Sequence, residues 1–205
     1  MADLPDRGNR HRARAEFFTA GGTLHLDAPS YVKRPADDKL FDLALFDEFC
    51  YVLTPRQMGK SSLMVRTARR LWAEGVRTAT IDPTAIGTGT VDEWYLALVH
   101  ELADELGVKV DVDTWWQARA ARSHVRRFVT FVRDVVLASV GGQILVFVDE
   151  IDTTLEFDFR DDFFAAIRAM YNARATEAEF RRLTFVLLGV ASPTHLIQDR
   201  ARTPF

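Results

Sequence analysis

The sequence predicts an α/β fold in which helices cover a mostly parallel sheet. Apolar runs alternate with amphipathic helical patterns along most of the 205 residues, which is typical of parallel strands joined by helical crossovers. The run 144–148 is apolar at every position, as in a central strand buried on both faces. Between residues 49 and 74, a strand, a Gly-Lys-Ser loop and a helical pattern follow one another.

The elements follow in order. Residues 16–26 are predicted as a short strand or extended arm. Next comes a helix with Leu40 and Phe41 on its apolar face, and two aspartates near its start suit the helix dipole. Gly75 is expected to end the helix that follows the Gly-Lys-Ser loop. Strands are predicted at 49–53, 78–82, 143–148 and 183–190, and helices near 37–46, 60–74, 91–106, 125–136 and 161–175. A further helical stretch is expected to begin at or after Trp115-Trp116.

Composition limits the classes of function. Hydrophobic residues make up 48% and charged residues 27% of the chain, and the net charge is −3, which does not favour a general nucleic-acid or membrane binder. The single cysteine, Cys50, excludes a disulfide framework and fits a reducing cytosol. No apolar run is long enough to span a membrane. Residues 1–15 are predicted as a disordered basic tail.

The Gly-Lys-Ser segment is predicted to be a phosphate-binding loop (P-loop, residues 54–62) of the Walker A type. Backbone N–H groups of such a loop surround an anionic phosphate, and the helix N-terminus adds its positive dipole end. Lys60 is expected to reach the β- and γ-phosphates of ATP from a solvent-facing position, and the Ser61 hydroxyl to bind Mg²⁺. The predicted nucleotide-binding residues here are Pro55, Arg56, Gln57, Met58, Gly59, Lys60, Ser61 and Ser62.

Thr54 departs from the P-loop pattern, which has glycine five residues before Gly59. A residue that precedes proline is pushed toward extended backbone angles, and a β-branched side chain suits that conformation. We therefore expect Thr54 to end the preceding strand rather than to form a left-handed turn.

A second motif, Val148-Asp149-Glu150, ends the buried strand and fits a Walker B motif. Asp149 is expected to hold Mg²⁺, and Glu150 to act as the general base that polarises the attacking water. The alternative is a strand end that carries solvated acids. Ser192, just after the last strand, either reaches the γ-phosphate or the water, or belongs to an ordinary Ser-Pro turn.

Several strings resemble the bacterial AAA-like domain family, within the additional-strand P-loop ATPases of the AAA+ and STAND type. They are Phe-Phe-Thr-Ala-Gly-Gly-Thr-Leu at 17–24, Ala-Pro-Ser-Tyr-Val at 28–32, Leu-Thr-Pro-Arg-Gln-Met-Gly-Lys-Ser-Ser-Leu at 53–63, Phe-Phe-Ala-Ala-Ile-Arg at 163–168, Leu-Leu-Gly-Val-Ala-Ser-Pro at 187–193 and Thr-Pro-Phe at 203–205. The resemblance covers residues 16–205.

The resemblance implies that Tyr31, Val32 and Arg34 contact adenine. It also implies a nucleotide-controlled switch, often joined to repeat domains or a signalling effector in a longer protein. Such relatives carry a fifth strand and a helical lid beyond the position where this chain stops, so the domain is expected to be C-terminally incomplete. Arg200 and Arg202 are candidate arginine fingers that act in trans, and a missing finger lowers the rate by roughly 10³–10⁵.

The same class resemblance implies a strand order in which the 183–190 strand lies between the 49–53 and 143–148 strands. The 49–53 strand then forms an apolar edge, which the arm around Phe17 to Leu26 covers or through which the chain self-associates. We predict a cytoplasmic, slowly hydrolysing ATP switch with Mg²⁺ as cofactor. The alternatives are a module that binds nucleotide with negligible turnover and an origin-recognition-type DNA-associated ATPase.

Overall fold

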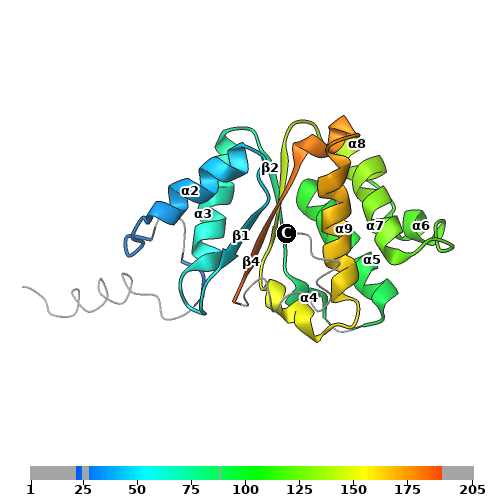
Figure 1. Cartoon of the computed structure of the whole chain (residues 1–205), viewed down its shortest axis with the longest axis horizontal. Coiled ribbons are helices and arrows are strands. Elements are labelled where there is room, and N and C mark those ends of the chain that lie inside the picture. The colour runs from blue at the N-terminus through cyan, green and yellow to red at the C-terminus, as the bar shows by residue number, and fades with distance from the viewer. Residues whose placement is uncertain (1–21, 25–27, 88, 191–205) are drawn as a thin grey trace, which may run out of the picture.

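The computed structural model of the protein describes residues 22–24, 28–87 and 89–190. Its sheet contains four parallel strands in the order β1-β4-β3-β2 (Figure 1). The strands are β1 (Cys50–Leu53), β2 (Arg77–Ile81), β3 (Ile144–Val148) and β4 (Leu183–Gly189). All four predicted strands are therefore present, and the predicted place of the last strand, between the P-loop strand and the 144–148 strand, is confirmed.

Helices cover both faces of the sheet in three layers (Figure 1). On one face lie α2 (Pro35–Leu45) and α3 (Lys60–Ala73). The other face is covered by α5 (Val91–Leu106), α7 (His124–Phe131) and α9 (Arg160–Ala173). The shorter helical elements are α4 (Pro83–Ile86), α6 (Val112–Gln117), η1 (Val132–Val136), α8 (Leu137–Ser139), η2 (Ile151–Glu156) and η3 (Ala178–Arg182).

Two apolar clusters join the layers, because side chains of β3 and β4 alternate between the two faces. Val146 and Leu187 belong to the cluster under α5, α7 and α9. Phe147 and Val186 belong to the cluster under α2 and α3. Every residue of β3 and β4 is buried, which agrees with the apolar runs that predicted central strands.

Helix α5 has capping residues at both of its ends. Thr90 caps α5 by accepting from the Glu93 N–H, and the Glu93 carboxylate accepts from the Thr90 N–H in return. Such a capping box satisfies backbone donors that the first turn leaves free. Gly107 ends the helix with a left-handed φ of 67°, which glycine adopts at little cost. The predicted bounds 91–106 are therefore confirmed.

One edge of the sheet, along β2, is covered by carboxylates of α5. The Thr80 N–H donates to Glu105 Oε2 at 3.0 Å, and the Asp82 backbone donates to Glu101. Burial raises the pKa of Glu101, although the hydrogen bond from Asp82 opposes this shift. Two outward-facing backbone donors of this edge are thus occupied, which leaves fewer sites for another strand to pair.

In the part of the chain that the structure describes, no helix combines the length and the apolar character needed to cross a membrane.

Candidate functional site

The P-loop connects β1 to α3 at the edge of the sheet where the strands end. The Thr54 N–H donates to the Gly189 carbonyl at 3.2 Å, so the ladder between β1 and β4 extends by one residue. Positive φ angles occur further on, at Gln57 (62°) and Gly59 (76°). The interpretation of Thr54 as a strand end is therefore confirmed, and the left-handed turn lies nearer the helix.

Lys60 is buried, with an exposed fraction of 6%. Its Nζ donates to the Thr54 carbonyl at 3.4 Å. The expectation of a solvent-facing Lys60 was wrong, because the side chain folds back across the loop and finds an acceptor at the strand end. Among the described residues, no ion pair to Lys60 is present. A buried ammonium with a neutral acceptor favours an anion nearby.

Ser61 and Asp149 bring the two sequence motifs into direct contact. The Ser61 hydroxyl donates to Asp149 Oδ2 at 3.0 Å, although the residues are 88 positions apart. Asp149 is 9% exposed, and its Oδ1 accepts from the Glu150 N–H at 2.9 Å. The contact depends on β3 and β1 ending at the same edge of the sheet.

The paired oxygens of Ser61 and Asp149 fit a magnesium ion. Mg²⁺ takes oxygen ligands at about 2.0–2.1 Å in octahedral geometry, so neighbouring ligand oxygens lie about 2.9 Å apart. The 3.0 Å between the hydroxyl and carboxylate oxygens matches this spacing. One hydroxyl and one carboxylate are also the protein ligands expected at a P-loop magnesium site.

Glu150 holds an unusual backbone conformation, with φ 46° and ψ 41° in the left-handed region. The position follows β3 and turns the chain into η2. A residue with a side chain rarely adopts this conformation, and such strain gathers at functional sites. Glu150 also lines the cleft above the P-loop, so its carboxylate belongs to the same site as Lys60 and Ser61.

The cleft at this site has a volume of about 720 Å³. Its walls contain seven of the predicted residues: Arg56, Gln57, Gly59, Lys60, Ser61, Ser62 and Glu150. Sequence reasoning missed the remaining lining residues, which are Gly22, Thr23, Leu24, Thr84 and Thr153. The Leu24 N–H donates to the Ser62 hydroxyl at 3.1 Å, so this part of the arm rests on the start of α3. The Gly-Gly-Thr-Leu string at 21–24, which belongs to the family resemblance, could have indicated that this segment lies at the site.

The other predicted site residues lie elsewhere or outside the description. Six predicted residues do not line the cleft: Pro55, Met58, Tyr31, Val32, Arg34 and Asp149, of which Asp149 is hydrogen-bonded to the lining residue Ser61. Val32 and Met58 have exposed fractions of 77% and 56%. Ser192, Arg200 and Arg202 lie outside the described residues, as do most of the arm and the tail 1–15.

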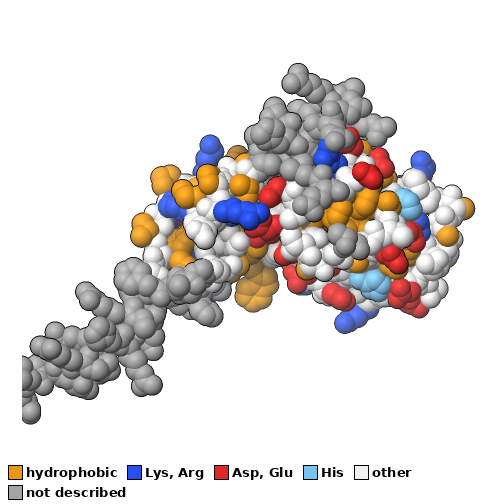
Figure 2. All heavy atoms as spheres, turned by 90° about the horizontal axis from the view of Figure 1, so that it is seen from below, with side chains coloured by type: hydrophobic (Ala, Val, Ile, Leu, Met, Phe, Trp, Pro, Cys, Tyr) orange, Lys and Arg blue, Asp and Glu red, His pale blue; other side chains and the backbone are white. Residues whose placement is uncertain are grey.

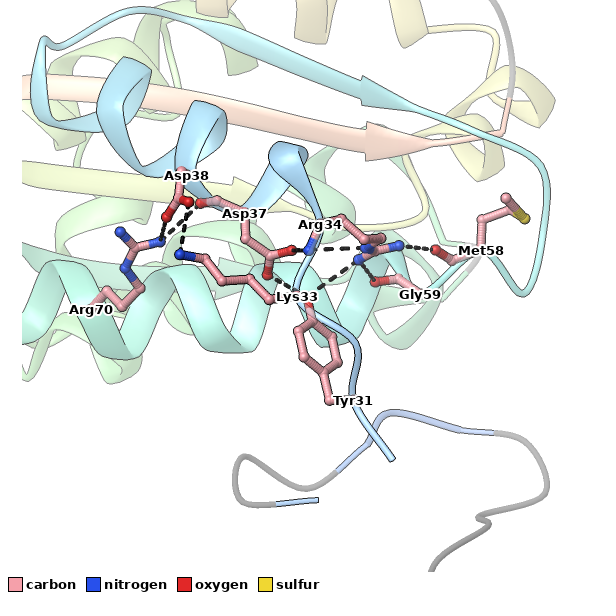
Figure 3. Close-up of polar contacts among 8 residues, drawn as sticks. All are labelled: Tyr31, Lys33, Arg34, Asp37, Asp38, Met58, Gly59 and Arg70. Carbon is pink, nitrogen blue, oxygen red and sulfur yellow. Dashed lines mark hydrogen bonds and ion pairs between the residues drawn. The ribbon is translucent and has the colours of Figure 1, made fainter. Parts of the chain in front are cut away.

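Arg34 reaches the P-loop from the start of α2 (Figure 3). Its guanidinium donates to the Met58 carbonyl at 2.6 Å and to the Gly59 carbonyl at 3.3 Å. Tyr31 lies beside it and donates its hydroxyl hydrogen to Asp37. Burial raises the pKa of Tyr31, and the hydrogen bond to Asp37 raises it further, so the hydroxyl remains a donor.

Asp152 ties the loop after β3 to the end of β4. Its Oδ1 accepts from the Val190 N–H at 2.9 Å. A Cβ at Gly189 would lie 2.6 Å from Ile151 Cγ2 and 2.9 Å from Asp152 Oδ1, so only glycine allows this approach. Asp152, three residues after Asp149, is thus a structural residue that holds the loop containing Glu150 against the end of β4.

The comparisons agree with this geometry. A sequence profile of the AAA-like domain matches residues 19–205. The chain belongs to the AAA-like domain family. This AAA-like domain is 40% identical over 193 residues to a WD repeat-containing protein of Synechocystis sp. (strain ATCC 27184 / PCC 6803 / Kazusa). The match covers 92% of this chain and 16% of that protein.

Solved structures share the fold of the AAA-like domain. The ORC2 protein of Aeropyrum pernix, in ADPNP-ADP complexes, matches with a TM-score of 0.57 and 12% identity, over 82% of this chain and 43% of that one. The ORC1 protein of the same organism, in complex with DNA, gives 0.54 and 15%, over 82% and 42%. At such low identity these matches show the P-loop ATPase fold alone. The AAA-like domain spans less than half the length of these relatives.

Proposed function

We propose that this AAA-like domain binds ATP with Mg²⁺, hydrolyses it slowly and serves as a nucleotide switch in a longer STAND-like bacterial signalling protein. The observation that carries the proposal is the hydrogen bond between Ser61 and Asp149 next to the buried Lys60. Lys60 and Ser61 of the first motif line one cleft with Glu150 of the second, and Asp149 contacts this cleft through Ser61. The first residues of α3 form part of the cleft wall.

Each residue takes a role that follows from its position. Backbone N–H groups at the start of α3 bind the phosphates, and the Lys60 ammonium leaves the Thr54 carbonyl for the stronger charge of the β- and γ-phosphates. Ser61 and Asp149 would hold Mg²⁺, which neutralises charge that develops on the phosphate oxygens. Tyr31 and Val32 are proposed to contact the base, as the family resemblance implies.

Glu150 is proposed as the general base. Its carboxylate takes a proton as a water oxygen attacks the γ-phosphorus, and the bond from that phosphorus to the bridging oxygen of ADP breaks. ADP and inorganic phosphate leave. Ser192 is proposed to contact the γ-phosphate or the attacking water from the end of β4.

Slow turnover is proposed from the charges around the cleft. Of the described residues that line it, the cations are Arg56 and Lys60, and both come from the P-loop itself. A cation that approaches the γ-phosphate from another element raises the rates of P-loop enzymes by roughly 10³–10⁵. In Figure 2, the Lys and Arg side chains of the described residues on the face shown lie among Asp and Glu side chains.

The relative with WD repeats supports the proposal that the domain is one part of a longer protein, because the matched region is a small share of that relative. A repeat sensor or an effector in the same chain would then respond to the nucleotide state. The proposal concerns the whole protein, of which this chain is the nucleotide-dependent part.

The experiment measures ATP affinity by calorimetry and phosphate release in the presence of Mg²⁺. Lys60→Ala is expected to weaken ATP binding strongly, because it removes a cation at the phosphates. Lys39→Ala is the matched control, because Lys39 is an exposed lysine of α2 and should leave the affinity unchanged. Equal ATP affinity in wild type and Lys60→Ala would falsify the proposed nucleotide site.

Two further variants separate hydrolysis from binding. Glu150→Gln is expected to keep ATP bound and to lower turnover, because an amide is a poor base. Asp149→Ala is expected to remove the Mg²⁺ dependence of binding. If wild type and Glu150→Gln release phosphate at the same rate, the catalytic role is wrong and a module that only binds nucleotide is favoured.

A further inference from the structure

Two arginines join α2 to the P-loop side of the molecule and differ in their acceptors (Figure 3). Arg70, on α3, donates to the Asp37 carbonyl at 3.0 Å and pairs with Asp38 Oδ1 at 3.1 Å. Both of its acceptors belong to α2. Arg34, at the start of α2, donates instead to the carbonyls of Met58 and Gly59, at 2.6 and 3.3 Å. Only the second arginine therefore acts on the loop that would surround phosphate.

The two carbonyls determine where two backbone N–H groups point. A trans peptide is planar, so the N–H of one residue points away from the carbonyl of the residue before it. With the Met58 and Gly59 carbonyls directed at the guanidinium, the N–H groups of Gly59 and Lys60 point away from it. Gly59 and Lys60 both line the cleft, so we infer that these N–H groups face it. The Gly59 carbonyl also accepts from the Leu63 N–H at 3.0 Å, which orients the same peptide along α3.

The guanidinium is itself held in place. The Arg34 backbone N–H donates to Asp37 Oδ2 at 2.9 Å, and the guanidinium Nε lies 3.8 Å from the same oxygen, in an ion pair without a hydrogen bond. Asp37 is 5% exposed. Tyr31 accepts from Arg34 Nη2 at 3.4 Å, and its ring lies 3.8 Å beneath the guanidinium of Arg66. The planar guanidinium donates from two separate nitrogens to the two carbonyls, in a rigid geometry that the single nitrogen of an ammonium does not reproduce.

Gly59 allows this contact as well as the turn. A Cβ at this position would lie 3.3 Å from Arg34 Nη1 and 3.5 Å from Nη2, and the φ of 76° already favours glycine. The loop and the arginine are thus shaped to lie against each other.

We propose that Arg34 is a positioning residue that pre-organises the phosphate-binding N–H groups of Gly59 and Lys60 without touching the nucleotide. This inference rests on the proposed function and replaces the adenine contact that the family resemblance implies for Arg34. A cradle that is ordered before binding costs less conformational free energy when phosphate arrives. The effect therefore acts on the phosphate part of a ligand and is independent of its base.

The test compares ATP with inorganic tripolyphosphate, which has phosphates and no base. Both compete with a fluorescent ATP analogue, in Mg²⁺, for wild type, Arg34→Met, Arg34→Lys and Arg70→Met. Arg34→Met is expected to weaken ATP and tripolyphosphate by the same factor, about tenfold or more, since charged hydrogen bonds are lost. Arg34→Lys should recover part of the loss, because lysine keeps a positive charge and N–H donors but lacks the planar guanidinium geometry.

Arg70→Met is the matched control, because it removes contacts between α2 and α3 and leaves the loop carbonyls with Arg34. It is expected to lower the thermal midpoint as Arg34→Met does, while both affinities stay within about twofold of wild type. Thermal unfolding of each variant verifies that it is folded. If Arg34→Met does not fold, the comparison is made with Arg34→Lys instead.

Three results would overturn the inference. A loss of ATP affinity with unchanged tripolyphosphate affinity would show that Arg34 contacts the base. Equal losses in Arg34→Met and Arg70→Met would show that both arginines only hold the helices together. Unchanged affinities in Arg34→Met would show that the loop needs no support. If wild type binds neither ligand, the proposed function itself fails, and this result is recognised without any variant.

Discussion

The two helical layers of the AAA-like domain are attached to the sheet in different ways. Behind one face, the core contains many fully buried aromatic side chains: Trp94, Tyr95, Trp116, Phe128, Phe131, Phe163, Phe164, Phe180 and Phe185. Behind the other face, α2 and α3 bury a smaller and mostly aliphatic cluster. There, Arg34 and Arg70 connect the parts through polar contacts, and Val32, Met58 and Trp72 remain exposed.

The difference indicates that the two helical layers contribute differently to the stability of the fold. Aromatic burial contributes most to the stability of a core, because each ring removes a large apolar area from water. The P-loop belongs to the layer with less of it, where hydrogen bonds rather than rings hold the neighbouring helices. Elements that adapt to ligands are generally drawn from such less stable parts of a fold. The P-loop part of the site thus belongs to the layer with fewer aromatic side chains, whereas Glu150 follows the buried strand β3.

The largest expected effect tests this contrast with one substitution in two places. Leu98 lies on α5 and Leu40 on α2, with exposed fractions of 0% and 5%. Leu98→Ala is expected to lower the free energy of unfolding by about 4–5 kcal/mol and Leu40→Ala by about 2–3 kcal/mol, within the range for buried leucines. Urea unfolding of both variants measures the difference. A larger loss for Leu40→Ala would reverse the comparison.

A smaller effect is expected where the loop after β3 meets β4. Gly189→Ala places a Cβ 2.6 Å from Ile151 Cγ2, and Ile151 is fully buried, so the substitution should cost about 1–3 kcal/mol through overpacking. Gly141→Ala is the matched control, because a Cβ there meets nothing within 4 Å. It should change the free energy of unfolding by less than about 0.5 kcal/mol. Similar midpoints for both variants would contradict the close approach.

The last expected effect is on the alkylation rate of Cys50, which reports whether water reaches the aliphatic cluster behind α2 and α3. Burial, with a contribution from Glu48, raises the pKa of the Cys50 thiol from 9.0 to about 11. The folded protein therefore keeps the proton, and the stabilisation is present below about pH 9 and lost as the pH rises toward 11. At pH 8, alkylation by iodoacetamide should be about 100-fold slower in the folded protein than in urea. A folded rate within tenfold of the urea rate would mean that water reaches this cluster.

Much of the fold was predictable from the sequence because it depends on local patterns. The four apolar runs predicted the strands, and class resemblance placed the last strand correctly in the sheet. Thr54 was interpreted correctly because a residue before proline has few conformations. The contact between Ser61 and Asp149 was implied by two motifs that follow parallel strands ending at the same side of the sheet, with one strand between them.

The features that were not predicted depend on contacts between distant residues. Burial of Lys60 requires the Thr54 carbonyl to face back across the loop. The acceptors of Arg34 lie 24 and 25 positions along the chain, and no periodicity connects them. The carboxylates that cover β2 look like ordinary surface residues of α5, because only the packing of that helix shows which backbone donors they meet.

Glu150 has a consequence for anyone who redesigns this protein. Its left-handed backbone conformation, with φ 46°, costs less conformational free energy for glycine or asparagine than for glutamate. A search that scores stability alone would therefore select replacements here and raise the melting temperature. The same substitution would delete the carboxylate nearest to the Ser61 and Asp149 pair along the chain. With the proposed role of Glu150 as general base, selection for heat resistance and selection for turnover would favour different residues at this single position.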